Sequence, residues 1–311
     1  MWGTPNKTCS KSTKHFQMSK RNLALVGATL VSLIYGLTFS VAKDVMPNFV
    51  GAYGFIVLRT AGTTALFWII SLFLPSEKIA KSDYLRILGC AFTGVALNML
   101  TFFKGLSLTS PISAAVLMVS TPIIVLILSA ILTQEKLKIQ KIIGIVLGLF
   151  GTVVLILYGK EISAGSQSGL GNFLVFINAV SYGFYLVIVR KLMTKYNAFT
   201  FVKWIYLLGF LMVLPFGLSE FQSIAWHNLP FDIILKIGFV VIFSTFFTYL
   251  LNLLSMKELK PTTVAVFIYL QPVFATIFAI SLGKDQLNSV KIIAAILIFL
   301  GVFLVTKPSK I

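Results

Sequence analysis

A single arginine inside an apolar stretch is the strongest candidate for binding chemistry in this chain. Arg59 lies within residues 51–74, which carry no other charged side chain. A guanidinium group donates paired hydrogen bonds to a carboxylate or a phosphate, so Arg59 could attract an anionic substrate. It could equally lie nearer to a helix end and bind backbone carbonyls or a neighbouring aspartate. The sequence leaves both interpretations open.

Amides, hydroxyl groups and phenols inside other apolar stretches form a second set of candidates. Such groups either hydrogen-bond a polar substrate or join one helix to another. A phenol also offers an apolar face, which suits the wall of a pocket. The residues that we predict to bind substrate together with Arg59 are Tyr35, Asn98, Thr121, Tyr182, Tyr206, Thr248, Asn252, Tyr269 and Gln271.

The residues that enzymes use for bond breaking do not come together in this sequence. The two histidines, His15 and His227, lie outside the apolar stretches, and we find no Ser/His/Asp set, metal-ligand spacing or phosphate-binding loop. We therefore predict no enzymatic activity, no cofactor and no metal. All nine acidic residues fall in loops or at the ends of apolar stretches, which argues against a proton relay through a buried carboxylate.

The overall composition is that of an integral membrane protein. Hydrophobic residues make up 58% and charged residues 11% of the 311 residues, and the mean hydropathy is +0.95. About 20 apolar residues cross a bilayer as a helix, whereas barrel strands would alternate apolar and polar positions. We predict an all-α membrane protein whose ten transmembrane helices span residues 22–42, 51–74, 84–103, 112–132, 140–158, 170–189, 199–217, 232–254, 263–282 and 290–306.

The charges between these spans indicate how the chain is oriented. Of the 26 lysines and arginines, 19 fall on the side of the N-terminus, six fall on the other side, and Arg59 lies within a span. Because basic loops remain in the cytoplasm, both termini are predicted to be cytoplasmic, with residues 1–21 forming a basic tail. The basic loops of a protein in a lipid bilayer thus account for the net charge of +17, and no nucleic acid partner is predicted. A multi-pass protein of the inner (plasma) membrane is expected.

An internal duplication relates the two halves of the chain. Residues 111–151 recur 150 positions later, so that Pro111 corresponds to Pro261 and Pro122 to Pro272. Each span of the second copy comes five spans after its counterpart, and because five is an odd number the second copy is inverted relative to the first, as in carriers that expose a central site to each side in turn. The pair Tyr35-Gly36 recurs as Tyr182-Gly183 at an offset of 147 and extends the repeats to residues 22–158 and 170–306.

Prolines and glycines occur at informative positions within these repeats. Pro122 and Pro272 fall in the middle of predicted spans, where proline removes a hydrogen bond and bends a helix. We interpret them as hinges, although membrane helices also tolerate proline without such a role. Gly144, Gly148 and Gly151 form a stripe of small residues, which indicates close helix packing and a possible homodimer contact through spans five and ten.

The first repeat contains an ordered series of short motifs. They are Tyr35-Gly36-Leu37-Thr38-Phe39, Arg59, Leu106-Ser107-Leu108-Thr109-Ser110, Thr121-Pro122, Glu135-Lys136-Leu137, Ile143-Gly144 and Gly151. The series resembles the EamA-type transporters of the drug/metabolite transporter superfamily, in two repeats that cover nearly the whole chain. That resemblance implies a secondary transporter, an exporter of small metabolites such as amino acids that works by alternating access. An uptake or exchange carrier for an anionic metabolite of the nucleotide-sugar or sugar-phosphate type is the alternative, followed by a channel.

Overall fold

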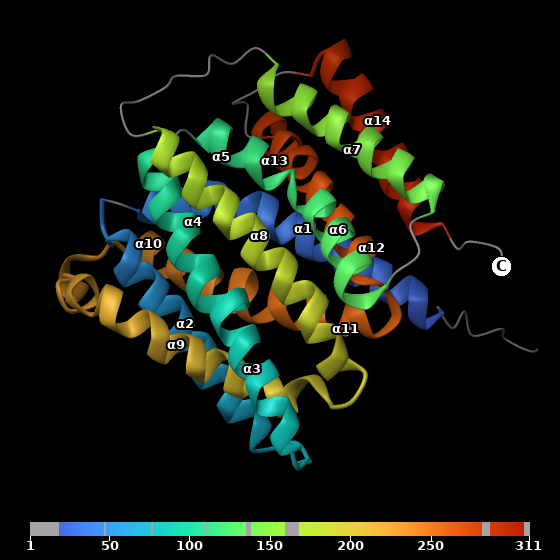
Figure 1. Cartoon of the computed structure of the whole chain (residues 1–311). Coiled ribbons are helices and arrows are strands. Elements are labelled where there is room, and N and C mark those ends of the chain that lie inside the picture. The colour runs from blue at the N-terminus through green and yellow to red at the C-terminus, as the bar shows by residue number, and fades with distance from the viewer. Residues whose placement is uncertain are drawn as a thin grey trace, which may run out of the picture.

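Helices form the whole secondary structure of the described residues. The structure, a computed structural model, describes residues 19–46, 48–75, 77–109, 111–134, 138–158, 168–281 and 287–307 (Figure 1). Its α-helices are α1 (Lys20–Val45), α2 (Ala52–Ser71), α3 (Tyr84–Ala91), α4 (Leu97–Leu108), α5 (Pro111–Met118), α6 (Thr121–Thr133), α7 (Ile139–Leu157), α8 (Ser168–Met193), α9 (Ala198–Gln222), α10 (Phe231–Phe239), α11 (Thr248–Glu258), α12 (Pro261–Val266), α13 (Leu270–Ser281) and α14 (Ser289–Thr306).

The predicted spans correspond to these helices. Nine stretches of the described chain are helical, long and apolar enough to cross a membrane. The remaining predicted span, 112–132, is divided into α5 and the short apolar helix α6. The all-α membrane fold is thereby confirmed, since an apolar chain must satisfy its backbone hydrogen bonds within each segment when it lies in lipid.

The two repeated prolines lie beside breaks between helices. α5 ends at Met118, and Pro122 lies in the first turn of α6. In the second copy a 3₁₀ turn separates α12 from α13, and Pro272 is the third residue of α13. The prediction of prolines in mid-helix was wrong in this detail: a first-turn nitrogen has no intrahelical acceptor, so proline costs little there. The interruptions occur at equivalent places in both copies.

Helix packing follows the duplication. α1 packs against α11 and α13, and α8 packs in the corresponding way against α4 and α6. The contacts between α2 and α9, between α6 and α12, and between α7 and α14 each join one span to its own counterpart. An exchange of the two halves therefore preserves the pattern of helix contacts.

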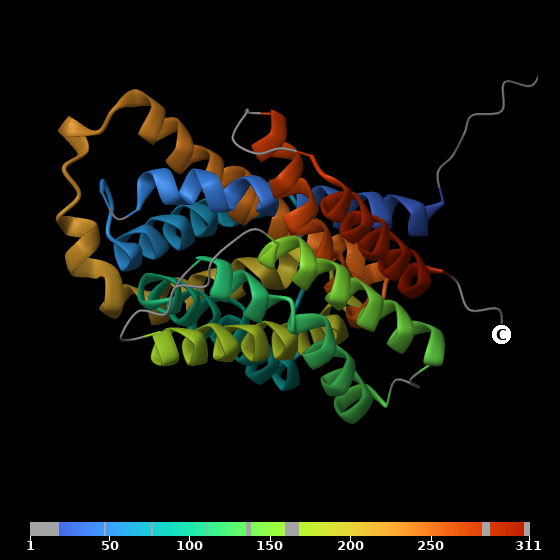
Figure 2. The same ribbon diagram turned by 90° about the horizontal axis from the view of Figure 1, so that it is seen from above.

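The contact between α7 and α14 reveals the relative direction of the two repeats. The two helices lie side by side at one flank of the molecule in both views (Figures 1 and 2). A Cβ added to Gly144 would lie 2.8 Å from the carbonyl oxygen of Gly301, and one added to Gly151 would lie 2.8 Å from that of Ala294. Residue numbers at the contacts increase along α7 while they decrease along α14, so the two helices are antiparallel. Because α7 and α14 are equivalent helices of the two repeats, the repeats are inverted.

These glycines are buried inside one molecule. Gly144 and Gly151 contact α14, and Gly148 contacts the ring of Tyr269. The sequence-based interpretation of the glycine stripe as close helix packing agrees with this arrangement. A homodimer through α7 and α14 would have to use their outer sides, where side chains such as Phe150 and Phe303 are exposed.

Candidate functional site

Arg59 is buried among helices from both halves of the chain. It lies about 10 Å along the axis from the start of α2, and the residue is only 7% exposed. Its Nε donates a hydrogen bond of 3.1 Å to the hydroxyl of Thr245. The rings of Phe55 and Phe103 lie with their centroids 6.0 and 5.4 Å from the guanidinium carbon. Among the described residues, no carboxylate lies within ion-pair distance of Arg59.

This environment distinguishes the two interpretations of Arg59. The side chain neither caps the carbonyl groups at a helix end nor pairs with an aspartate of the described chain. Its positive charge is met by one hydroxyl group and by the faces of aromatic rings, which stabilise a cation modestly. An unneutralised guanidinium in a membrane interior is expensive and typically marks a functional site.

Thr245 lies in a π-helical segment that has an equivalent in the other half of the chain. Residues Phe92–Ala96 in span three and Val240–Phe247 in span eight both form π-helix, and an offset of 150 places the first segment within the second. The Thr245 hydroxyl donates to the carbonyl oxygen of Val240 at 2.7 Å, which leaves its lone pairs to accept from Arg59. π-Helical turns are rare and occur frequently at functional sites.

One face of α11 joins the predicted polar residues to both repeats. A hydrogen bond of 3.3 Å connects the hydroxyl groups of Thr248 and Tyr35. One turn later, Nδ2 of Asn252 donates to the hydroxyl of Tyr182 at 3.4 Å. Tyr35 and Tyr182 are repeat equivalents, so α11 and the adjoining π segment contact the same motif from each half. The structure thus brings Tyr35, Arg59, Tyr182, Thr248 and Asn252 together.

Aromatic rings form a continuous wall beside these groups. Ring centroids are separated by 6.0 Å between Tyr182 and Tyr185, by 5.3 Å between Tyr185 and Tyr249, and by 4.7 Å between Tyr249 and Tyr206. The buried hydroxyl groups of Tyr206 and Ser244 have no hydrogen-bond partner among the described residues. These groups are available to a polar ligand, because buried polar atoms normally find partners.

The other predicted site residues form no side-chain hydrogen bond to this cluster within the described chain. Tyr269 is buried in a second core, against Gly148 of α7. The Thr121 hydroxyl donates to the Met118 carbonyl at 2.7 Å and so stabilises the chain break before α6. Asn98 is linked through its backbone carbonyl, which accepts from Asn178, and the backbone carbonyl oxygen of Gln271 would lie 3.0 Å from a Cβ on Gly36. Their place in a substrate site stays a prediction.

The prolines lie close to the tyrosine motifs across the boundary between halves. A Cβ on Gly36 would lie 3.1 Å from Phe274, two residues after Pro272. A Cβ on Gly183 would lie 3.0 Å from Ile124, two residues after Pro122. These two contacts are repeat equivalents. Each Tyr-Gly pair therefore packs on the helix that begins beside the repeated proline of the other repeat. A movement at either helix interruption would displace the tyrosines that line the site.

Thr245, Ser244 and Tyr249 belong to the cluster but were not predicted. Thr245, Thr248 and Asn252 are spaced by three and four residues, the interval that places side chains on one helix face. That spacing was the signal that could have identified Thr245. The π segment itself has no such signal, because residues 240–247 are an ordinary apolar run without proline or glycine.

Both repeats match a known protein family. The sequence profile of the EamA-like transporter family matches residues 22–157 and again residues 169–307. The chain belongs to the EamA-like transporter family. The EamA resemblance predicted from the motifs is confirmed. With its helices long enough to cross a bilayer, the chain is a multi-pass membrane transporter.

Relatives and a solved structure have similar sequences or folds. An uncharacterized transporter of Archaeoglobus fulgidus is 27% identical over 278 residues, which cover 89% of this chain and 96% of the relative. The uncharacterized transporter YoaV of Bacillus subtilis is 26% identical over 91% of this chain and 96% of its own length. A solved crystal structure that is 19% identical matches 92% of the chain with a TM-score of 0.77, which shows that the fold is shared.

Proposed function

We propose that this EamA-family protein is a secondary carrier that exports small carboxylate-bearing metabolites, such as amino acids and related compounds, by alternating access. The observation that carries the proposal is the buried guanidinium of Arg59, which has a single described hydrogen bond and no described ion pair. A substrate carboxylate would provide charge-assisted hydrogen bonds to this group. Transport, without chemical change of the substrate, is the function that such a site supports.

The surrounding groups define what kind of molecule fits beside Arg59. Tyr206, Ser244 and Tyr249 have hydroxyl groups without a described partner, while the rings of Tyr182, Tyr185 and Tyr249 form an apolar wall. A substrate with one carboxylate and a short, partly apolar body would satisfy both kinds of surface. This combination supports an amino acid-like metabolite over a large hydrophilic one.

Polar contacts at the two ends of the molecule support alternating access. At one end, the Asp83 carboxylate accepts hydrogen bonds from Lys195 and Tyr196 and raises the pKa of Lys195 above its usual range, so this lysine stays charged. At the other end, Lys236 pairs with Asp44 at 2.9 Å. Contacts of this kind join separate helices, and a carrier would break those at one end while it retained those at the other.

The orientation follows from the loop charges. Both termini are proposed to be cytoplasmic in an inner (plasma) membrane, which places Asp83 and Lys195 at the cytoplasmic end and Lys236 at the outer end. In this orientation an exporter binds substrate from the cytoplasm and releases it outside.

An exchange carrier for an anionic metabolite is the second candidate. One observation favours it: the described part of the cluster around Arg59 contains no acidic side chain that could pair with the ammonium group of an amino acid. A substrate with negative charge alone would need no such partner.

Counterflow in proteoliposomes tests the proposal. Unlabelled amino acids or organic anions inside the vesicles should stimulate uptake of the labelled compound, with saturation, and Arg59→Gln should weaken apparent affinity about tenfold or more. Arg59→Lys should recover only part of the affinity, because lysine lacks the planar fork. Arg190→Gln, an arginine at the end of α8, is the control and should transport normally. Nonsaturating flux would contradict the carrier, and unchanged affinity in folded Arg59→Gln would contradict the binding of the substrate carboxylate by Arg59.

A further inference from the structure

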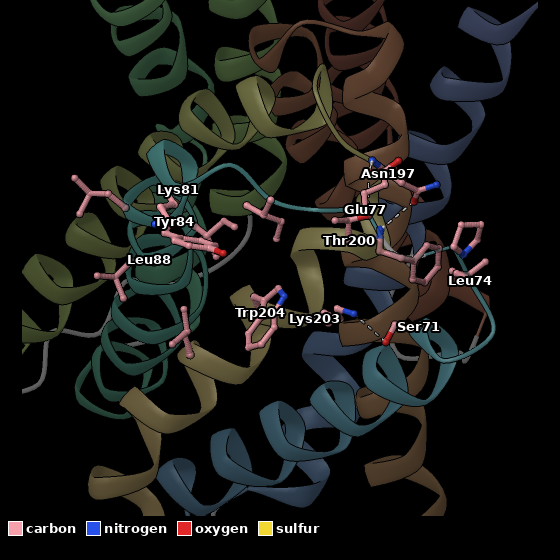
Figure 3. Close-up of a pocket in the computed structure, with 16 residues that line it drawn as sticks. Ser71, Leu74, Glu77, Lys81, Tyr84, Leu88, Asn197, Thr200, Lys203 and Trp204 are labelled. Atoms are coloured by element: carbon pink, nitrogen blue, oxygen red, sulfur yellow. Dashed lines mark hydrogen bonds between the residues drawn. The ribbon is translucent and has the colours of Figure 1, made fainter.

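A cleft at one end of the molecule lies apart from the Arg59 cluster. It encloses about 820 Å³ between the end of α2, the start of α3 and the start of α9. Figure 3 shows Lys81, Tyr84 and Leu88 on one wall and Lys203 with Trp204 on another. Lys203 is the sixth residue of α9, about 8 Å along the axis from its start. This depth corresponds to the boundary between headgroups and acyl chains if α9 begins at the membrane surface.

Two lysines of this cleft have no acidic partner in the described chain. Lys203 forms a 3.5 Å hydrogen bond with the Ser71 hydroxyl, and its ammonium lies 5.1 Å from the ring of Trp68. Neither contact neutralises its charge. Lys81 begins the short turn before α3 and forms no ion pair with a described residue.

Among the described residues that line the cleft, the one acidic side chain, Glu77, caps a helix. Oε2 of Glu77 accepts hydrogen bonds from the backbone nitrogen of Asn197 at 2.8 Å and from the Thr200 hydroxyl at 3.0 Å. It thereby stabilises the N-terminus of α9, where a negative charge is favourable. These donors are neutral, so Glu77 keeps its charge, but its carboxylate is directed to the start of α9 and not to a lysine; with Lys81 and Lys203 the lining keeps an excess of positive charge.

The lip of the cleft is apolar and faces outward. Leu85 is 78% exposed, and Leu88 and Tyr84 are exposed beside it on α3. In a membrane protein these side chains face acyl chains. A soluble anion would gain nothing from them, whereas a phospholipid could place its headgroup between the lysines and its chains along α3.

We propose that this cleft binds an anionic phospholipid, with the lipid phosphate between Lys81 and Lys203 and the acyl chains against Leu85 and Leu88. Basic pockets between membrane helices are suited to such headgroups, and each lysine near the surface contributes roughly a fivefold increase in affinity. The bound lipid joins α2, α3 and α9, whose ends form the cleft. The site is separate from substrate binding, so its existence does not depend on the carrier mechanism.

Native mass spectrometry of the purified full chain tests the proposal. With phosphatidylglycerol and phosphatidylcholine offered in equal amounts, the wild-type protein should retain phosphatidylglycerol preferentially. The variant Lys81→Gln/Lys203→Gln should bind it about 25-fold more weakly, and each single variant about fivefold. Lys257→Gln, an exposed lysine of α11 outside the cleft, is the matched control and should bind normally.

Two further arms identify the source of the phosphate. Glycerol 3-phosphate should not displace the lipid, and Leu85→Gln should weaken lipid retention although it removes no charge. Because Lys81, Lys203 and Leu85 lie at the surface of the cleft, these variants should elute as the folded wild-type protein does. Equal retention of both lipids, unchanged binding in the double variant, or displacement by glycerol 3-phosphate would overturn the proposal.

Discussion

At the scale of single residues, the geometry around Arg59 is the basis of substrate recognition. The Thr245 hydroxyl accepts from Arg59 Nε, so the remaining guanidinium nitrogens can face a ligand. The same hydroxyl donates its own hydrogen bond to the Val240 carbonyl oxygen. Thr245 is therefore expected to position Arg59 without contacting the substrate itself.

Replacement of Thr245 tests this positioning role. Thr245→Val removes the acceptor of Arg59 at nearly constant volume and should raise the Michaelis constant of transport about tenfold, because a hydrogen bond to a charged group is lost. Thr245→Ser should retain the wild-type value. Thr152→Val is a matched control, since within the described chain the buried Thr152 hydroxyl bonds to its own helix at Gly148 and to no other residue. A Michaelis constant unaffected in Thr245→Val would contradict the role.

Residue-level prediction had its clearest signal where an isolated side chain was chemically unusual. Arg59 was identifiable because a charge in an apolar span has few benign explanations. Tyr269 was included for its phenol, yet it packs against Gly148, because sequence depth within a span does not indicate which neighbour a side chain meets. The pairing of Arg59 with Thr245 could not be predicted, since it depends on how α2 crosses span eight.

At the scale of helices, close backbone contact fixes the position of α7 against α14. Gly144 and Gly301 leave no room for a side chain, because a Cβ on Gly301 would lie 2.6 Å from the Gly144 carbonyl oxygen. Small residues permit this approach, and packing of this kind stabilises membrane helices in the absence of a hydrophobic driving force.

Alanine at Gly144 tests the packing directly. Gly144→Ala should force the two helices apart and lower the free energy of unfolding by about 1–3 kcal/mol, seen as a lower melting temperature in detergent. Gly169→Ala is the control, because no atom lies within 4 Å of the added Cβ. Equal melting temperatures for the two variants would show that α7 and α14 can separate without loss of stability.

Helix positions were predictable to within a few residues, but helix interruptions were not fully predictable. Apolar length alone places the spans, since lipid enforces one helix per crossing. The prolines indicated where spans four and nine deviate, although the chain breaks before Pro122 where a bend in one helix was expected. The π segments Phe92–Ala96 and Val240–Phe247 were not predicted, because a π turn is defined by its backbone hydrogen bonds and the hydropathy of a sequence does not indicate them.

At the scale of the whole molecule, the inverted repeats explain why the site lies where it does. Tyr35 from the first repeat and Tyr182 from the second both reach α11. Each Tyr-Gly pair also packs on the helix after the proline of the other repeat. A structure built from two inverted halves has a counterpart in which the halves exchange conformations, and the site would then face the opposite side.

Distances between spin labels at the two ends test this exchange most directly. In nanodiscs, one label pair on Thr194 and Lys257 reports on the end near Asp83, and another on Leu170 and Asn228 reports on the end near Lys236. Addition of a transported substrate should shift the two distance distributions in opposite directions, and Arg59→Gln should abolish the shift. If both ends change in the same direction, or if neither changes while substrate is transported, alternating access by the two halves is contradicted.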